Sequence, residues 1–417
     1  GGNSWIELTA AQTTGTFESE IFDSESSSSD WSSLAWVPQR PSYKDITATT
    51  ETAYSTGNVD VTGLKLLLHM EEASGTVEDS SGNDNDGTSN ANPTYQATGQ
   101  LGYGMDFQVG DNDFVEVSAT EVTDLFDDSE DFTLAFWFNA DLLAEDDVGA
   151  VDILISKSYT SHTTPWYQFD VRTEATKQIT AQFWRSDNGN DKYLVASSGN
   201  DAYDKNQWHH IVVIGDLIND EIYLYIDGSE VGSDTTTTGS FSDYATSLCI
   251  GANCEAGGVN SNFDGTIDEV ALWDRILSDT EILDLYKRGA VSLKYQVRTC
   301  DDDACSGENF IGPAGTTAAA DNWSELTDGD LGTPSINLVN ALDANYFDDK
   351  QYFQYQANLA TDNSSYIPEL KSTTITYASG AAVPEFKDYL LIATIMLCLG
   401  LVLNNKLSLS PVPIQTP

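Results

Sequence analysis

Short stretches in which every second residue is apolar dominate this sequence, and they most constrain its fold. Residues 221–226 (EIYLYI) place three branched apolar side chains on one face of an extended chain, and Asp227-Gly228 after them favours a type I′ turn. Residues 131–140 (DFTLAFWFNA) alternate in the same way. A period of two residues is that of a strand with one buried face. Many such runs, separated by Gly, Asn, Asp and Ser, predict an all-β sandwich or barrel.

Two segments have the features of helices instead. In residues 278–289 (SDTEILDLYKRG), Ser278 can cap a helix, Glu281 completes a capping box, and Gly289 is expected to close it. Residues 389–405 (YLLIATIMLCLGLVLNN) carry no charge and would form a helix of roughly 25 Å. That hydrophobic helix could cross a bilayer, pack against its own copies in an oligomer, or enter a soluble core.

The strands near both ends of the sequence favour a domain split by an insertion. Residues 16–37 supply only two strands, which are marginal alone, whereas residues 291–377 supply several more. Pairing the two sets makes one sandwich, and a second domain is then inserted between them. The predicted order is an N-terminal extension (1–15), a split β-sandwich domain (16–57 plus 291–378) around an inserted domain (58–290), a linker (379–388), the hydrophobic helix (389–405) and a tail (406–417).

Four of the five cysteines form two local pairs. Cys249 and Cys254 enclose four residues, as do Cys300 and Cys305, and Cys398 lies in the apolar run. No histidine accompanies the pairs as in a zinc ribbon, so we expect two short-loop disulfides and an exported location; four reduced structural thiols are the alternative. The chain opens Gly-Gly-Asn-Ser-Trp, and we expect residue 1 to be a terminus left after processing.

The charge balance excludes one class of partner. The chain has 18 Lys and Arg against 66 Asp and Glu, a formal charge of −48. Binding of nucleic acid or anionic lipid requires clustered basic side chains, which this chain lacks. The acidity fits a solvated exterior, a high-salt habitat or cation binding.

Several segments together resemble the laminin-G-like group of the concanavalin A-like lectin/glucanase superfamily. They are GLKLLLHMEEASGTVEDSSGNDNDGT, GYGMDFQVGDNDFVEV, FTLAFWFNA, NQWHHIVV, IYLYIDG and DGTIDEVALWDRILSDTEI, which occur in this order between residues 60 and 290. The resemblance implies an all-β laminin-G-like jelly-roll sandwich for the inserted domain. The flanking strands resemble a sandwich of bacterial and archaeal surface proteins. The tail VPEFKDYLLIATIMLCLGLVLNNK resembles exosortase- or archaeosortase-type sorting signals, although only one basic residue, Lys406, follows the apolar run.

A calcium ion is the most credible cofactor. The loop from Asp79 to Asp86 (DSSGNDND) offers the carboxylate, amide and carbonyl oxygens that Ca²⁺ prefers. The resemblance implies that this loop and the acidic residue of the closing strand meet over a structural ion, with Asp79, Asn83, Asp86 and Asp268 as ligands. A solvated polar turn without an ion is the alternative.

Enzymatic chemistry is not expected. Glucanases use two carboxylates that flank one glycosidic bond, on one face of a strand. Asp268 and Glu269 are adjacent, so a regular strand would point them to opposite faces. No nucleophile motif is present, and the resemblance implies that His209-His210, which follow Trp208, pack and pair within a strand.

The expected function is therefore that of an extracellular surface protein. Lectin-type binding needs aromatic rings beside loops, for which Trp166, Trp184 and Tyr203 are candidates, and Asn322 and Asn363 begin glycosylation acceptor patterns. The first hypothesis is adhesion, through binding of a glycan or protein by the jelly roll. The alternative is a self-assembling subunit of an extracellular filament or surface layer, held by the hydrophobic helix or by exchange of an N-terminal strand.

Overall fold

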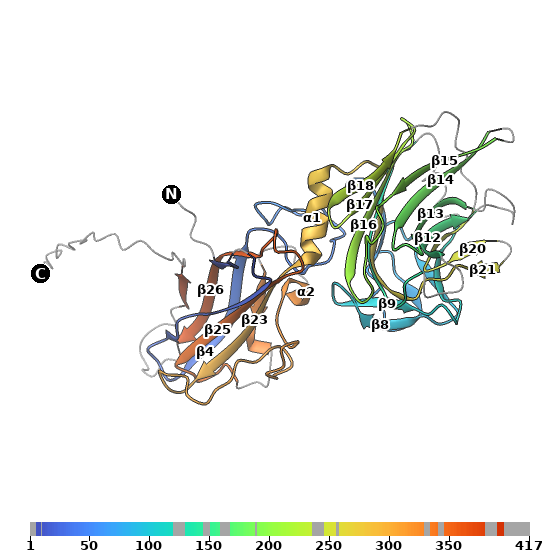
Figure 1. Cartoon of the computed structure of the whole chain (residues 1–417). Coiled ribbons are helices and arrows are strands. Elements are labelled where there is room, and N and C mark those ends of the chain that lie inside the picture. Colours follow the sequence, from blue (N-terminus) through green and yellow to red (C-terminus); the bar gives the residue numbers. More distant parts are fainter. Residues whose placement is uncertain are drawn as a thin grey trace, which may run out of the picture.

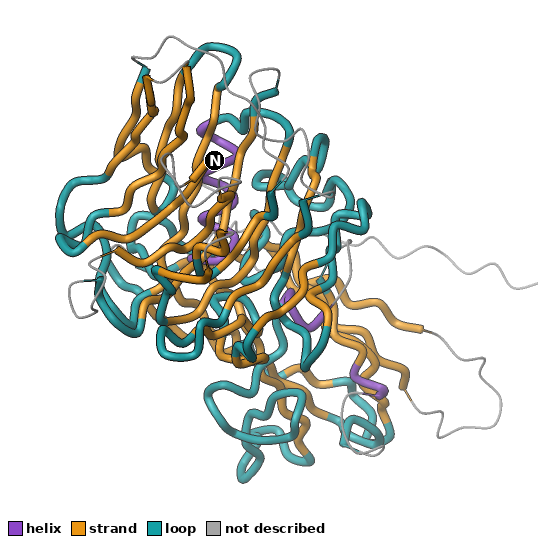
Figure 2. Tube along the Cα trace, turned by 90° about the vertical axis from the view of Figure 1, so that its right-hand side faces the viewer, coloured by secondary structure: helices purple, strands orange, loops and turns teal. Residues whose placement is uncertain are grey.

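The protein consists of two β-sandwiches of unequal size that lie side by side (Figure 1). The structure is a computed structural model and describes residues 6–9, 11–119, 130–144, 151–158, 167–187, 190–235, 246–255, 258–328, 334–340, 346–379 and 390–395. Strands make up most of the ordered elements, and helices are few (Figure 2). The predicted all-β class is confirmed.

The larger domain is a jelly roll built from two antiparallel sheets. One sheet has the order β15-β14-β13-β12-β19-β10-β7-β6, and the other has the order β18-β17-β16-β11-β22-β9-β8 with β5 beside β22. The strands are β5 (Leu64–Leu68), β6 (Thr76–Val77), β7 (Gly87–Asn90), β8 (Thr94–Thr98), β9 (Tyr103–Phe107), β10 (Phe114–Val117), β11 (Phe132–Ala140), β12 (Val151–Ser158), β13 (Tyr167–Glu174), β14 (Ile179–Asp187), β15 (Asn190–Ser197), β16 (Trp208–Asp216), β17 (Glu221–Ile226), β18 (Ser229–Asp234), β19 (Leu248–Ile250) and β22 (Gly265–Trp273). A hairpin of β20 (Asn253–Glu255) and β21 (Gly258–Asn260) extends from it.

The core of the jelly roll lies between these sheets. It contains the alternate apolar residues that define the strands in the sequence, among them Phe132, Leu134, Phe136 and Phe138 of β11. At the turn between β17 and β18, Asp227 and Gly228 both have positive φ values (50° and 76°), as a type I′ turn requires.

The smaller domain is a sandwich whose strands come from both ends of the sequence. One sheet has the order β1-β26-β4-β24 with β27 on β26, and the other has the order β2-β25-β23 with β3 on β25. The strands are β1 (Ile6–Glu7), β2 (Thr14–Glu18), β3 (Phe22–Asp23), β4 (Ser29–Pro38), β23 (Val291–Cys300), β24 (Ser335–Asn337), β25 (Tyr352–Thr361), β26 (Glu369–Ser379) and β27 (Leu390–Ile395), with a 3₁₀ turn, η1 (Leu338–Asn340). The blue strand β4 therefore lies among the orange-to-red strands in Figure 1.

Aromatic rings fill the core of the smaller domain. Trp36 packs on Tyr295 with ring centroids 4.6 Å apart, and Trp31 packs on Phe353 at 5.0 Å. Each pair joins a residue from the first forty to one that follows the jelly roll. The core of this domain therefore forms only when both halves are present.

Helix α1 (Asp279–Ala290) connects the two domains. Its capping box is confirmed: the Ser278 hydroxyl accepts from the Glu281 backbone, and the Glu281 carboxylate accepts from the Ser278 N–H at 2.8 Å. The prediction that Gly289 closes the helix is wrong, because the helix continues to Ala290. Gly289 is instead required by packing, since a Cβ there would lie 2.6 Å from the Trp137 ring.

The C-terminal apolar run is partly a strand rather than the predicted helix. Residues 390–395 form β27, paired antiparallel with β26 from Thr373↔Ile395 to Ala378↔Leu390. The prediction failed because an uninterrupted apolar run has no period, and the exposed backbone of β26 accepts a strand there. The rest of residues 389–405 and the tail 406–417 lie outside the described residues. No helix in the described part of the chain is long and apolar enough to cross a membrane.

Both predicted disulfides are present. Cys249 bonds to Cys254 beside β19 and β20, and Cys300 bonds to Cys305 after β23. Cys398 lies outside the described residues.

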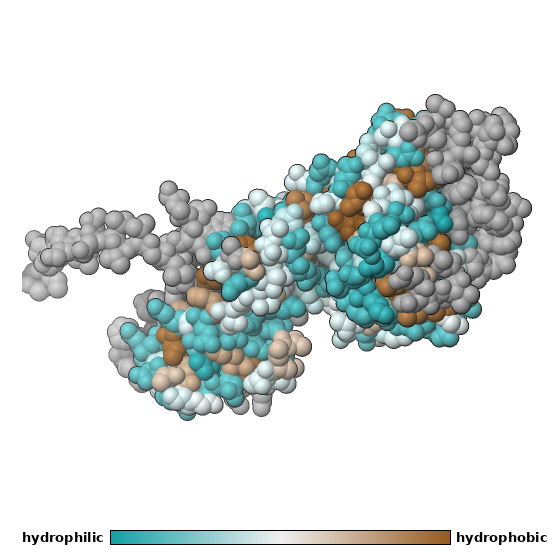
Figure 3. Space-filling model, in the orientation of Figure 1, coloured by the Kyte–Doolittle hydropathy of each residue, from teal (hydrophilic) through white to brown (hydrophobic). Residues whose placement is uncertain are grey.

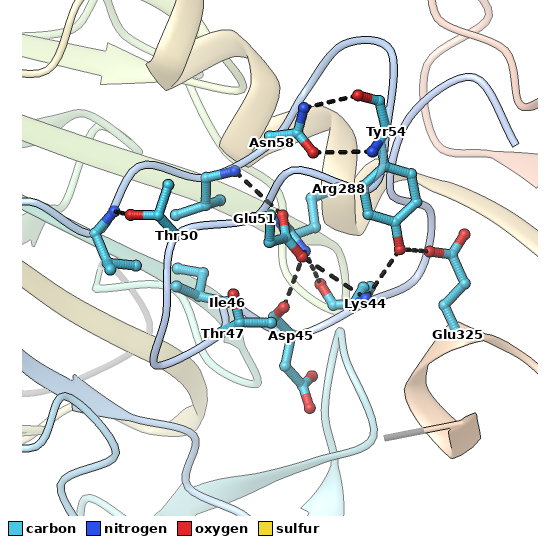
Figure 4. Close-up of polar contacts among 12 residues, drawn as sticks. Lys44, Asp45, Ile46, Thr47, Thr50, Glu51, Tyr54, Asn58, Arg288 and Glu325 are labelled. Atoms are coloured by element: carbon cyan, nitrogen blue, oxygen red, sulfur yellow. Dashed lines mark hydrogen bonds and ion pairs between the residues drawn. The ribbon is translucent and has the colours of Figure 1, made fainter. Parts of the chain in front are cut away.

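A buried polar network joins α1, the segment of residues 41–60 and the smaller domain (Figure 4). This segment is called the linker below and is distinct from the predicted linker at residues 379–388. Glu51 of the linker forms an ion pair with Arg288 of α1, and both side chains are fully buried. Lys44 lies 3.7 Å from Glu51 and donates to the Tyr54 hydroxyl at 2.9 Å. Tyr54 in turn donates to Glu325 of α2 (Glu325–Asp328).

We predict that Glu51→Gln destabilises the chain by about 3–5 kcal/mol, because Arg288 and Lys44 would then be buried without their carboxylate. The midpoint of denaturant-induced unfolding measures the effect. Asp204→Asn, which removes the exposed partner of Lys177, is the control and should change stability by no more than about 0.5 kcal/mol. Equal stability of Glu51→Gln and wild type would contradict the prediction.

Strand β13 carries a polar row on the face that turns away from the core. Asp170 is fully buried there, accepts from Gln182 of β14 at 2.7 Å, and lies 3.0 Å from Arg172. Arg172 also contacts Glu174, so a cation lies between the two carboxylates. Burial raises the pKa of Asp170 to about 7.

This raised pKa predicts a stability that falls as pH rises. Above about pH 4 the unfolded carboxyl is ionised, whereas the folded one keeps its proton until about pH 7. The stabilisation is thus complete at low pH and is lost as pH rises through that window. The free energy of unfolding of Asp170→Asn, relative to that of wild type, should therefore rise by on the order of 2 kcal/mol from pH 5 to pH 8. Chemical denaturation at both pH values tests this. Asp84→Asn, at an exposed position, is the control, and its difference in stability from wild type should be the same at both pH values.

Candidate functional site

A cleft of about 370 Å³ lies where the jelly roll, α1 and the smaller domain meet. Its walls come from five separate parts of the chain: the loop before β9, the start of β16, the β17–β18 turn, helix α1, and the residue after β25. The lining residues are Gln100, Asn206, Gln207, Trp208, His209, Asp227, Tyr286 and Asp362.

One wall of the cleft is aromatic. Trp208 is half-buried at the first position of β16 and packs, with Tyr366, against a cluster of Trp137, Tyr286 and Ala290. The Tyr286 ring stacks on Trp137 at 5.7 Å and meets the edge of Tyr366 at 6.0 Å. This packing fixes the rings before any ligand arrives.

The rest of the cleft lining consists of polar groups held in defined orientations. Asp227 accepts from the His210 backbone N–H at 2.9 Å and lies 3.0 Å from His209 Nδ1. Gln100 donates to Asp362 at 2.8 Å and to the carbonyl of Gly289 at 3.1 Å. Within the described residues, the buried Nε2 of His209 has no hydrogen-bond partner.

The ionisation of these groups follows from their surroundings. Partial burial, reinforced by the charge of Asp227, raises the pKa of Asp362. Burial lowers the pKa of His210 to about 4, so its ring is neutral where it packs on Trp137. Aromatic rings together with amide, imidazole and carboxylate groups in one cleft suit a ligand with one apolar face and many hydroxyls.

The sequence did not reveal this cleft. His209-His210 were expected to pack and pair, which His210 does, whereas His209 also lines the cleft. Trp208 and Tyr286 are far apart in sequence, and each has an ordinary position in a strand or helix. The polar run Asn206-Gln207 beside an aromatic residue was the only local signal.

The side chains of the predicted calcium loop form hydrogen bonds with the backbone around them. Asp79 accepts from the N–H groups of Leu67 and Asn85, both at 2.9 Å. Asp86 accepts from the Asp79 N–H at 2.8 Å, and Asn83 donates to the Leu64 carbonyl at 3.0 Å. The structure thus brings Asp79, Asn83 and Asp86 together in one turn. Calcium binding there stays a prediction.

Asp268, the fourth predicted ligand, belongs to a different cluster. A bulge in β22 shifts its register against β11 between Ala135 and Trp137, and Glu269 adopts a φ of 52°. Ile267 and Val270 both enter the jelly-roll core, so the two residues between them, Asp268 and Glu269, share the outer face. The expectation that they point to opposite faces is wrong, because a bulge breaks the two-residue alternation.

His69 and Asp45 complete this outer-face cluster. His69 Nδ1 contacts Glu269 Oε1, and Ile46 N–H donates to Glu269 Oε2 at 3.1 Å. Burial opposes the charged imidazole, but the charges of Glu269 and Asp45 raise the pKa of His69 to about 10. Burial and the charge of Glu269 raise the pKa of Asp45 to about 8, and the same causes raise that of Asp268 well above its ordinary value.

The predicted aromatic platforms have three different outcomes. Trp166 lies outside the described residues. Trp184 pairs with Tyr193 in the β14–β15 ladder. Tyr203 is only 2% exposed and packs on Phe138 at 5.6 Å, so its expected place at the surface is wrong. An aromatic residue in a turn-rich segment can cover the open end of a sandwich core, and the sequence does not distinguish that role from an exposed one.

Both predicted glycosylation acceptors are half-buried in the smaller domain. Asn322 Nδ2 donates to the Ala319 carbonyl at 2.6 Å, and the Asn363 side chain accepts from the Ser365 N–H at 3.0 Å. Their modification stays a prediction.

Three of the solved structures that match parts of this chain are the following. Trypanosoma rangeli sialidase in complex with the inhibitor DANA has a TM-score of 0.41 and 15% identity over 55% of this chain, but only 33% of that chain is covered. Domain 4 of AbnA, a GH43 extracellular arabinanase from Geobacillus stearothermophilus in complex with arabinotriose, has a TM-score of 0.35 and 17% identity over 54% of this chain and 98% of that one. The CBM40 of the Ruminococcus gnavus IT-sialidase bound to alpha2,3 sialyllactose has a TM-score of 0.31 and 16% identity over 38% of this chain and 83% of that one.

Curated proteins give no match to the sequence. A family match is found for residues 109–283, from the loop before β10 into α1, and its description is the concanavalin A-like lectin/glucanases superfamily. The family match confirms the predicted resemblance of the inserted jelly roll to the concanavalin A-like lectin/glucanase superfamily over residues 109–283.

Proposed function

We propose that this chain is a non-catalytic, extracellular glycan-binding protein that holds a sugar in the cleft beside Trp208. The observation that carries the proposal is the composition of that cleft: packed aromatic rings line it together with side-chain amides, an imidazole and carboxylates. Pyranose rings have apolar C–H faces that stack on aromatic rings and hydroxyls that hydrogen-bond to planar polar groups. The match of the jelly roll to a superfamily of lectins and glucanases supports a carbohydrate ligand.

The negative charge of the chain and of its cleft limits the class of glycan that can bind. The formal charge is −48, and Asp227 and Asp362 both line the cleft. Binding of an anionic sugar would cost electrostatic free energy, because the negative charges of the chain would repel it. The face in Figure 3 is also mainly hydrophilic, with apolar residues in separate patches. The preferred ligand is therefore a neutral oligosaccharide.

The hydrogen bonds in the cleft favour binding over hydrolysis. A glycosidase needs one free carboxylate as nucleophile or base and a second as acid. Both carboxylate oxygens of Asp227 are engaged, one by His209 and one by the His210 N–H. Two disulfides support a place outside the cell, where such a protein can serve adhesion.

Trp208→Ala should weaken binding of the best neutral glycan by about tenfold or more, because the stacking surface is lost. An array of neutral and sialylated glycans identifies the ligand, and calorimetry with the full chain measures its affinity. Gln207→Ala, an exposed change in the same cleft, is a second variant that leaves the packed rings intact.

Tyr103→Ala is the matched control, since that ring is 48% exposed and lies outside the cleft lining. Unchanged binding by the folded Trp208→Ala and Gln207→Ala proteins would place the glycan elsewhere. A preference for sialylated glycans would refute the neutral class.

We also predict that the bound oligosaccharide is recovered intact after prolonged incubation with the chain, because Asp227 is committed to the two histidines. Chromatography of the recovered sugar measures this. Shortened products that disappear in Asp362→Asn would show instead that the cleft is catalytic.

A further inference from the structure

Three potential ligand atoms meet beneath the linker, on the outer face of the sheet that contains β5 and β22. They belong to Asp45 of the linker, His69 just after β5, and Glu269 in the β22 bulge, and all lie within 4.8 Å of one another. Figure 4 shows the Asp45 carboxylate directed away from the Glu51–Arg288 network. The Asp45 backbone takes part in that network instead, because its carbonyl accepts from Arg288 at 2.9 Å.

Asp268 supplies a second, independent observation. It is 0% exposed, and its Oδ1 has no hydrogen-bond partner within the described residues, whereas Oδ2 accepts from the Leu101 N–H at 2.9 Å. The bulge places Asp268 on the same face as Glu269. Its charge interacts with those of Glu269 and Asp45, so Asp268 lies near the cluster, although only the other three residues offer ligand atoms within 4.8 Å of one another. Burial of a carboxylate oxygen without a hydrogen-bond donor costs free energy unless a cation or a proton binds to it.

The charges around this cluster do not balance. Asp45, Asp268 and Glu269, with Glu71 nearby, face a single imidazole. Arg288 also reaches the Asp45 carboxylate electrostatically, but its guanidinium is already paired with Glu51. Buried carboxylates in such excess are normally paired, protonated or bound to a metal.

We propose that Asp45, His69, Asp268 and Glu269 bind one divalent transition-metal ion of the Zn²⁺ class. One imidazole nitrogen and several carboxylate oxygens form a donor set that suits Zn²⁺, whereas Ca²⁺ is held by oxygens alone. The ion would join the linker to two strands of the jelly roll. This site is distinct from the loop at residues 79–86 and from the glycan cleft, so its test is independent of both.

The test uses the full chain, produced without a histidine tag, stripped with a chelator and titrated with Zn²⁺ in a calorimeter. One Zn²⁺ should bind per chain and raise the melting temperature. His69→Gln and Asp268→Asn should each weaken Zn²⁺ binding by more than about tenfold. Asp170→Asn, a buried carboxylate on the other sheet, and Asp79→Asn, in the separate loop, should bind as wild type does.

Removal of Asp268 from a buried cluster could prevent folding, so circular dichroism accompanies each titration. His69 is partly exposed, and His69→Gln keeps the test decisive if Asp268→Asn does not fold. Absence of Zn²⁺ binding by the folded wild-type chain would overturn the proposal. Binding that survives in folded His69→Gln, or that is lost only in Asp79→Asn, would overturn it as well.

Discussion

The ion pair between Arg288 and Glu51 is the interaction on which the arrangement of the two domains depends. Both side chains are fully buried, and together they fix the last turn of α1 to the linker. From Glu51 the contacts pass to Lys44 and Tyr54, and Tyr54 reaches Glu325 in the smaller domain. Burial raises the pKa of Glu325 to about 7. A short buried polar network thus joins the two domains, alongside the aromatic contact between Tyr286 and Tyr366.

Helix α1 links this network to both candidate sites. Arg288 lies in the buried junction, and Tyr286, two residues earlier, forms part of the aromatic wall of the cleft. Arg288 also holds the backbone of Asp45, whose carboxylate reaches the proposed metal site. The orientation of one helix therefore sets the geometry of a surface cleft and of a buried cluster.

What the sequence predicted correctly depends on local chemistry. The capping box of Ser278 and Glu281, the type I′ turn at Asp227-Gly228 and the two disulfides each involve residues a few positions apart. The alternation of apolar residues also gave the all-β class, because it reports directly which face is buried.

The failures have physical causes of another kind. The β22 bulge places Glu269 on the opposite face from the one that a regular strand would give it. The residues at a bulge do not form a pattern that distinguishes them from those of a regular strand. Strand β27 depends on an edge offered by β26, and the cleft depends on Trp208 and Tyr286 meeting across the fold. Each requires tertiary contacts that a single sequence does not display.

The split of the smaller sandwich also determines the order in which the polypeptide can mature. Strand β4 has to wait for its partner β26, which emerges from the ribosome more than three hundred residues later. The jelly roll, whose strands are contiguous in the chain, can close during that delay. By closing, it pairs its first strand, β5, with β22, which directly precedes α1, and so shortens the effective loop that the outer sandwich must form. The inserted domain thus acts as a folding template for the domain that encloses it in sequence.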